Sequence, residues 1–379
     1  MLTRLSSTSA RITEVGDVAE RLAVLFKKQE KLHEDKFLVA TMDEIATLGE
    51  FGLIDRLTHG ITPRHDTTVL GIGDDAAAIR HSADRLTLVT TDLLLEGVHF
   101  DLTYTPLKHL GYKTAVVNFS DIYAMNGRPT QLLVALGLSK RFAVEDIEAI
   151  YDGIRHACDV YGVDLVGGDT SASLTGLTLS ATCIGDVPSD RIVRRDGAHD
   201  TDLICVSGDL GAAYMGLQLL EREKRVFRGE SDFAPDFAGR EYLLERQLRP
   251  EARRDIVESL ASADLLPTAM IDISDGLASE LLHIAARSHV GCRIYEDRLP
   301  IDYQTAVMAE EFNMNLATAA LNGGDDHELL FTLPLSVYDR AERLPGVRII
   351  GHITRPEQGC ILVGRDGGEV PLQAQGWKA

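Results

Sequence analysis

Two spacings of apolar residues take turns along this chain. Short apolar runs of strand length are separated by longer stretches in which apolar residues recur at helical spacing. In the first half, the pattern predicts strands at 67–73, 86–92, 131–138, 163–168 and 178–187, and helices at 48–58, 107–125 and 144–162. Because strands and helices are interspersed, we predict the α+β class.

The second half repeats the same mixture of periods. Strands are expected at 203–208, 269–274, 292–296, 327–333 and 347–353, and helices at 212–223 and 277–288 with two more between them. A polar, turn-rich segment at 191–202 separates the halves, and 379 residues exceed the size of one hydrophobic core. We therefore predict two domains, 42–187 and 188–379.

Residues 1–41 differ in composition from the rest of the chain. The first dozen are rich in Ser, Thr and Arg and contain no acid, and no secretory apolar core follows them. We interpret 1–41 as an N-terminal extension, either a disordered tail or the product of an upstream start codon.

Charge and cysteine content narrow the class of protein. The chain has 58 acidic and 38 basic residues, a net charge of −20, which disfavours binding to nucleic acid or to an anionic membrane. No run approaches the ~18 apolar residues of a membrane-spanning helix. The cysteines are odd in number and lack C-x-x-C spacing, which indicates reduced, mostly buried thiols in a cytoplasmic protein. They are Cys158, Cys183, Cys205, Cys292 and Cys360.

Aspartates recur where strand-like runs end. Five runs finish in a small residue followed by carboxylates, at Asp74-Asp75, Asp92, Asp169, Asp275 and Asp325-Asp326. Tight turns at strand ends allow such side chains to converge. Carboxylates without matching Lys or Arg favour divalent cations, and a polyphosphate is the natural anionic guest of Mg²⁺. The pattern indicates a metal-dependent phosphate enzyme.

Familiar phosphate and metal motifs do not explain these aspartates. No G-K dipeptide exists for a P-loop, the protein-kinase set is missing, and an EF-hand starting at Asp272 fails because its twelfth residue is His283. The segment GIGDDA at 71–76 matches the dinucleotide fingerprint. However, little room remains for its helix, and two carboxylates would face a pyrophosphate.

One further aspartate lies within a predicted helix. Asn118 and Asp121 are three residues apart and therefore share a helix face. Their apolar neighbours leave little purely polar surface, which favours a carboxylate that points into a site. The alternative is an ordinary surface aspartate.

Nine motifs in order carry a family resemblance. They are GEFGLI (49–54), GIGDDAA (71–77), TTD (90–92) with His99-Phe100, NFSDIYAM (118–125), GGDT (167–170), RDGA (195–198), LRP (248–250), IDISDGL (271–277) and GGDDHEL (323–329). From about Leu48 to Gly376-Trp377-Lys378 the chain resembles thiamine-monophosphate kinases. The resemblance implies the two-domain α+β fold of the aminoimidazole ribonucleotide synthetase superfamily, which binds ATP and dimerises through its N-terminal domain.

The resemblance also implies roles for individual residues. Those expected to hold several Mg²⁺ ions are Asp75, Thr90, Thr91, Asp92, Asp121, Asp169, Asp272 and Asp275. Those expected to contact ATP are Tyr151, Gly168, Asp169, Arg195 and Ser274. Those expected to contact thiamine monophosphate are His99, Asp325 and Trp377.

The implied reaction is phosphoryl transfer from ATP to thiamine monophosphate, the last step of thiamine diphosphate biosynthesis. It needs no protein general base, and a requirement for a monovalent cation is left open. The chain departs from the family at Asp325 and His327, where Glu and Tyr are usual, and it ends at Ala379 without the common His-Phe.

Three alternatives stay open. A selenophosphate synthetase would carry a reactive cysteine near its N-terminus, whereas the first cysteine here is Cys158. A purine-precursor synthetase would not be expected to show GEFGLI, His99-Phe100 and the terminal Gly-Trp. A non-catalytic acidic metal-binding protein would not need glycine beside its aspartates so regularly.

Overall fold

The computed structural model describes residues 52, 54, 56–226 and 237–374. The compact unit Gly60–Trp377 contains both of its sheets. Of the helix predicted at 48–58, the described residues 52, 54 and 56–58 are all helical. The extension at 1–41 and Trp377 lie outside the described residues.

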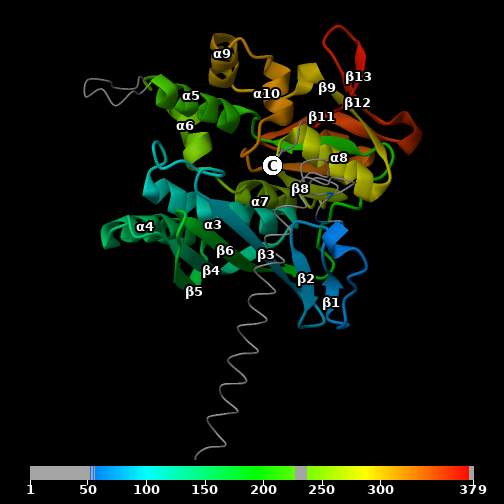
Figure 1. Cartoon of the computed structure of the whole chain (residues 1–379). Coiled ribbons are helices and arrows are strands. Elements are labelled where there is room, and N and C mark those ends of the chain that lie inside the picture. Colours follow the sequence, from blue (N-terminus) through cyan, green and yellow to red (C-terminus); the bar gives the residue numbers. More distant parts are fainter. Residues whose placement is uncertain (1–51, 53, 55, 227–236, 375–379) are drawn as a thin grey trace, which may run out of the picture. The chain divides into compact units, whose positions relative to one another are not determined.

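The first sheet has six strands. They are β1 (Thr68–Leu70), β2 (Ala77–Arg80), β3 (Arg85–Leu95), β4 (Arg128–Leu138), β5 (Asp164–Ala172) and β6 (Thr178–Pro188). Their order is β1-β2-β3-β6-β4-β5, and all neighbours are antiparallel except β4 and β5. Helices α3 (Leu107–Ala124) and α4 (Val144–Tyr161) pack against this sheet (Figure 1).

Helices α3 and α4 pack together at unusually close range. A Cβ added to Gly153 of α4 would lie 1.9 Å from the carbonyl oxygen of Lys108, and one added to Gly111 of α3 would lie 1.9 Å from that of Ile150. Two facing glycines therefore permit this approach. It makes α3 the central buried helix, with Phe119 and Ile122 fully buried.

The second sheet has seven strands. They are β7 (Leu203–Ser207), β8 (Ala269–Ile273), β9 (Gly291–Tyr295), β10 (Glu328–Leu333), β11 (Val347–Thr354), β12 (Cys360–Val363) and β13 (Glu369–Pro371). Their order is β13-β12-β9-β11-β7-β10-β8, and only β9 and β12 are parallel neighbours. The helices are α5 (Ala212–Val226), α6 (Glu241–Leu248), α7 (Arg254–Ser262), α8 (Leu277–Ser288), α9 (Tyr303–Glu311), α10 (Leu316–Asn322) and α11 (Tyr338–Ala341).

Both faces of the second sheet are covered. Ile284 of α8 belongs to the same apolar cluster as Ile271 of β8, while Ile256 of α7 clusters with Met270 on the other side of that strand. Strands buried on both faces form continuous apolar runs, as residues 203–206 of β7 do. Helix α3 also contacts β8, which brings the two sheets' elements together within one unit.

The predicted strands are all present, and the structure adds elements that the pattern did not predict. Strands β2, β12 and β13 are three to four residues long, too short for a clear period. Because β2 begins at Ala77, no dinucleotide-binding helix starts there, and the exclusion of that motif is confirmed. The domain boundary between residues 187 and 188 stays a prediction.

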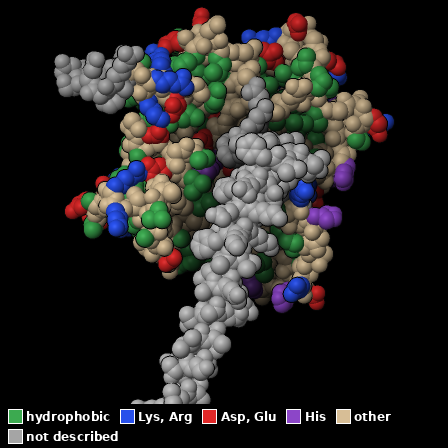
Figure 2. Space-filling view, in the orientation of Figure 1, with side chains coloured by type: hydrophobic (Ala, Val, Ile, Leu, Met, Phe, Trp, Pro, Cys, Tyr) green, Lys and Arg blue, Asp and Glu red, His purple; other side chains and the backbone are tan. Residues whose placement is uncertain are grey.

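The cysteines are mostly buried, as the sequence predicts. Acidic and basic side chains are interspersed on the face shown in Figure 2. Four of the five free cysteines are buried, and Cys360 is half-buried. Among the described helices, none combines the length and apolar character that crossing a bilayer demands.

Candidate active site

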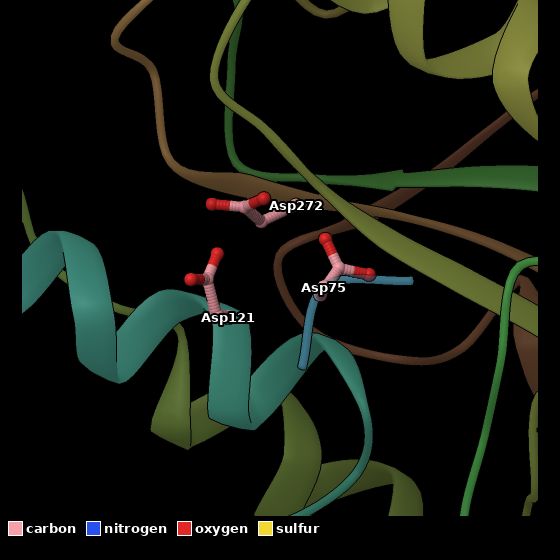
Figure 3. A group of neighbouring side chains, drawn as sticks. All are labelled: Asp75, Asp121 and Asp272. Carbon is pink, nitrogen blue, oxygen red and sulfur yellow. The ribbon is translucent and has the colours of Figure 1, made fainter. Parts of the chain in front are cut away.

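Three aspartates from separate parts of the chain meet at one point. Asp75 comes from the loop before β2, Asp121 from the last turns of α3, and Asp272 from β8 (Figure 3). One carboxylate oxygen of each lies within 4.8 Å of the others. Since oxygen ligands gathered at such spacing suit a hard divalent cation, the residues present fit Mg²⁺.

The loop that carries Asp75 is shaped by its neighbours. Gly73 has φ of +119°, which strongly favours glycine at this position. The carboxylate of Asp74 accepts hydrogen bonds from the backbone N–H of Asp75 at 3.0 Å and of Arg195 at 3.1 Å. These bonds fix the turn, so the carboxylate of Asp75 is held towards the interior, where its side chain is 1% exposed.

Asp121 is the least balanced charge of the three. Thr90 on β3 donates a hydrogen bond to its carboxylate at 2.5 Å, but among the described residues no Lys or Arg forms an ion pair with it. Burial raises its pKa well above the usual range, and the carboxylates of Asp92, Asp272 and Asp75 raise it further. This carboxylate would be stabilised in its charged form by a cation.

Asp272 is oriented by groups that come from other elements. The hydroxyl of Ser120, the residue before Asp121 in α3, donates to its carboxylate at 2.7 Å. The Nδ1 atom of His327 lies 3.4 Å from the same oxygen. Helix α3 therefore contributes one carboxylate and positions a second.

Arg195 lies against the group at Asp75. Its Nε and one terminal nitrogen donate to the two carboxylate oxygens of Asp75 at 3.1 and 2.6 Å. Burial nevertheless raises the pKa of Asp75 to about 7, with Arg195 opposing the shift and Asp272 adding to it. A guanidinium thus lies directly beside the carboxylates, and the contact of Arg195 with ATP stays a prediction.

Sequence reasoning missed Glu280, which belongs to the same acidic region. Its side chain lies in α8, is 2% exposed, and accepts the backbone N–H of Asp275 at 2.8 Å. Burial raises its pKa well above the usual range, and Asp275 and Asp272 raise it further. The sequence did offer one indication, a single glutamate within the apolar segment LASELL. A glutamate buried among apolar residues usually has a partner or a function.

The loop carrying Asp325 adjoins the aspartate group through His327. The carboxylate of Asp325 lies 2.9 Å from the Nζ atom of Lys113 and 3.7 Å from Nε2 of His327, whose other nitrogen faces Asp272. Although desolvation opposes it, the Lys113 ammonium holds the pKa of Asp325 well below its usual range. The two family departures, Asp325 and His327, therefore contact each other.

Of the metal ligands predicted on β3, two face the aspartate group and one faces away from it. Thr90 and Asp92 share the face of β3 that looks towards Asp121, whose pKa both affect. Thr91 lies on the opposite face of β3, because side chains alternate along a strand, and its hydroxyl donates to the carbonyl of Ala181 at 2.9 Å. Its side chain is not brought to the aspartate group.

Gly168 and Asp169 also lie away from the aspartate group. Both are exposed on β5, the edge strand that β4 and β6 separate from β3. A Cβ at Gly168 would lie 1.8 Å from the carbonyl oxygen of Val134, so only glycine fits against β4. Three strand spacings of about 4.8 Å therefore lie between Asp169 and β3.

The other predicted contacts lie in three places. Tyr151 packs against the core of the first sheet from α4, and Ser274 is exposed after β8. His99 is exposed after β3, where its Nδ1 accepts the backbone N–H of Leu95 at 2.9 Å. Trp377 lies outside the described residues. The assigned role of each of these residues stays a prediction.

Comparison with known proteins shows which family this chain belongs to. Residues 73–187 match the family described as AIR synthase related protein, N-terminal domain. The chain is 36% identical over 332 residues to thiamine-monophosphate kinase of Aquifex aeolicus (strain VF5), covering 87% of this chain and 98% of that protein. The chain belongs to the thiamine-monophosphate kinase family. Identity to the Bacillus subtilis (strain 168) kinase is 33%, over 87% of this chain and 99% of that one.

Solved structures extend the likeness to three dimensions. AaThiL complexed with AMPPCP and TMP matches with a TM-score of 0.76 and 34% identity, covering 89% of this chain and 99% of that one. The thiamine-monophosphate kinase from Stenotrophomonas maltophilia K279a matches with a TM-score of 0.66 and 36% identity, over 86% and 98%. The predicted α+β fold of this superfamily is therefore confirmed, and the chain is an enzyme of the kinase family.

Proposed function

We propose that this chain transfers the γ-phosphoryl group of ATP to the phosphate of thiamine monophosphate, forming thiamine diphosphate and ADP. The observation that carries the proposal is the convergence of Asp75, Asp121 and Asp272 beside Arg195 and the Asp325 loop. The related AaThiL was solved with an ATP analogue and TMP together, which supports the same pair of reactants here.

Charge is the main obstacle to this reaction. Donor and acceptor are both anions, and the described site presents more carboxylates than cations. Bound Mg²⁺ would supply positive charge that neutralises the phosphates and aligns the attacking and leaving oxygens. Asp75, Asp121 and Asp272 would hold such an ion, with Thr90 and Asp92 adjoining them, and we propose that more than one ion is used.

The chain's own groups then have separable tasks. We propose that Arg195, which contacts Asp75, binds nucleotide phosphate, while Ser120 and His327 hold the carboxylate of Asp272 in place. The attacking group is a phosphate monoester, already largely ionised at neutral pH because its second pKa is about 6. A direct in-line transfer therefore needs no protein general base.

The direct assay mixes purified protein with ATP, Mg²⁺ and thiamine monophosphate and measures both products. We expect thiamine diphosphate and ADP to form in equal amounts. ADP without thiamine diphosphate would show that the acceptor is another molecule. A nucleotide-independent cation binder would give neither product, which separates that alternative from the kinase.

The in-line geometry has its own test. With ATP made chiral at the γ-phosphorus, a single direct displacement inverts the configuration at phosphorus. Retention would indicate two successive displacements through a phosphorylated enzyme, and it would contradict direct transfer even if thiamine diphosphate were formed.

A homodimer is the assembly we propose, formed through the open face of the first sheet. Thr91 and Leu93 lie on the β3 face that points away from α3, and Leu93 and Val166 are 52% and 54% exposed. Apolar side chains on an uncovered sheet face favour burial against a partner. Light scattering should give about twice the 41.4 kDa chain mass, and Leu93→Asp should lower it. A monomeric wild type would contradict the dimer.

A further inference from the structure

Two cysteines that are far apart in the sequence lie side by side in the second sheet. Strand β12 runs parallel to β9, and Cys360 is the register partner of Cys292. Adjacent strands are about 4.7–4.9 Å apart, and the Cα atoms of disulfide-bonded cysteines are separated by about 4.4–6.8 Å. The backbone therefore already has a separation that a disulfide can span.

Backbone hydrogen bonds hold this register on both sides. The N–H of Cys292 donates to the carbonyl of Gly359 at 3.0 Å, and the N–H of Leu372 donates to the carbonyl of Cys360 at 2.8 Å. Among the described strands, β12 and β13 form the outer edge of the sheet, and β9 is the strand that connects them to the rest of it. A covalent link at this point would fasten the edge strands to the rest of the sheet.

The two thiols have different environments and therefore different chemistry. The interaction of the two neighbouring thiols raises the pKa of Cys292, which burial raises further, and lowers the pKa of Cys360 to about 7. Cys360 is half-buried, whereas Cys292 is fully buried. Since the thiolate is the nucleophile, Cys360 is the thiol that can react first with a small molecule.

The other cysteines provide an internal contrast. Cys158, Cys183 and Cys205 are buried in the apolar cores of the two sheets, and burial raises the pKa of each thiol. These three have the properties of inert core residues. Reactivity is therefore expected at the pair between β9 and β12.

We propose that Cys360 and Cys292 form a redox site at which a small disulfide, such as oxidised glutathione, converts the dithiol into an intrachain disulfide. The Cys360 thiolate attacks one sulfur of the small disulfide, forming a mixed disulfide and releasing one thiol. Cys292 then loses its proton and attacks the Cys360 sulfur, releasing the second thiol. Two protein thiols are oxidised, and one small disulfide is reduced to two thiols.

The test uses the whole chain in its folded state. The reduced protein is incubated with oxidised glutathione near neutral pH, its remaining thiols are alkylated in denaturant, and its peptides are mapped by mass spectrometry. We expect the five thiols of the chain to fall to three, with one peptide pair joined through Cys292 and Cys360. Five thiols, or glutathione left on Cys360 of the wild type, would overturn the proposal.

Variants test the order of the two steps. Cys292→Ser should trap glutathione on Cys360, and Cys360→Ser should leave Cys292 unreacted. Cys158→Ser is the matched control and should form the same cross-link as the wild type. Oxidation of Cys292 in the Cys360→Ser protein would contradict the assignment of Cys360 as the attacking thiol. Because the readout is thiol chemistry, it does not depend on the proposed kinase reaction.

Discussion

Two buried carboxylates on neighbouring strands, Glu328 and Asp272, belong to sites that differ in how their negative charge is balanced. Glu328 of β10 is 1% exposed and is bound by two arginines, Arg246 and Arg253, and by the hydroxyl of Ser207. On the paired strand β8, Asp272 belongs to the aspartate group, in which Asp121 forms no ion pair among the described residues.

The difference separates a structural site from a ligand-binding one. Carboxylates as buried as Glu328 are tolerated when cations and hydrogen bonds satisfy them, and such a site is complete by itself. The aspartate group has Arg195 at Asp75 and His327 at Asp272, which leaves Asp121 with a hydroxyl alone. Its missing positive charge is what a bound cation would supply.

The largest expected effect is on turnover. Asp121→Asn should lower kcat about 10³-fold, which corresponds to about 4 kcal/mol of transition-state stabilisation, because a metal ligand is lost. The variant should stay folded, because the substitution removes a carboxylate that neighbouring carboxylates repel. The matched control is Asp159→Asn on the exposed face of α4, which should leave kcat unchanged. Wild-type turnover in the Asp121 variant would remove the distinction between the two groups.

The balanced group should respond through stability instead. Glu328→Gln leaves Arg246 and Arg253 without their shared carboxylate, so the free energy of unfolding should fall by about 3 kcal/mol or more. Urea unfolding measures the change, with Glu148→Gln on exposed α4 surface as control. A loss of kcat without loss of stability would show that Glu328 acts in the reaction.

Added Mg²⁺ should distinguish the groups directly. At a concentration 100 times its Kd, an ion bound only by the folded state adds about 2.7 kcal/mol to the free energy of unfolding. Thermal scans should show this increase in the wild type and in Glu328→Gln, but a much smaller one in Asp121→Asn. Equal responses in all three proteins would place the ion elsewhere.

The smallest effect is the pH dependence of stability without metal. The folded-state pKa of Asp121 is raised, so the folded chain binds a proton more tightly than the unfolded chain, and stability falls as pH rises from about 4. In chelator-containing buffer, the fall in the free energy of unfolding above pH about 4 should be shallower in Asp121→Asn, because that variant lacks the titrating carboxylate. If the wild type and Asp121→Asn showed the same dependence of stability on pH, Asp121 would not be a buried carboxylate repelled by its neighbours.

Much of the fold and part of the site could be predicted from local patterns. The spacing of apolar residues predicted the main strands and helices, because that spacing depends on which side of a segment is buried. The spacing of Asn118 and Asp121 correctly placed that aspartate on an inward face, and Asp121 does meet Asp75 and Asp272. Because side chains alternate along a strand, Thr91 was predictable as pointing away from Thr90. The TTD motif, which groups the two residues, does not show this.

Contacts between distant elements could not be predicted in this way. Ser120 reaches Asp272 only because α3 lies against β8, and Glu280 enters the acidic region only through the start of α8. Which carboxylate receives an arginine is equally a matter of packing. Nothing local in the sequence shows that Arg195, 120 residues away, would bind the strand-end acid Asp75.

The sequence by itself determined the class of elements, the supply of strand-end aspartates and the family to which the chain belongs, because these depend on local period and residue identity. Only the tertiary structure decided which carboxylates meet, which of them are bound by arginine, and that Cys292 lies opposite Cys360 on the neighbouring strand. The physical reason is that burial and charge balance are set by neighbours in space, and residues on α3, β8 and β12 become neighbours only when the sheets and helices pack.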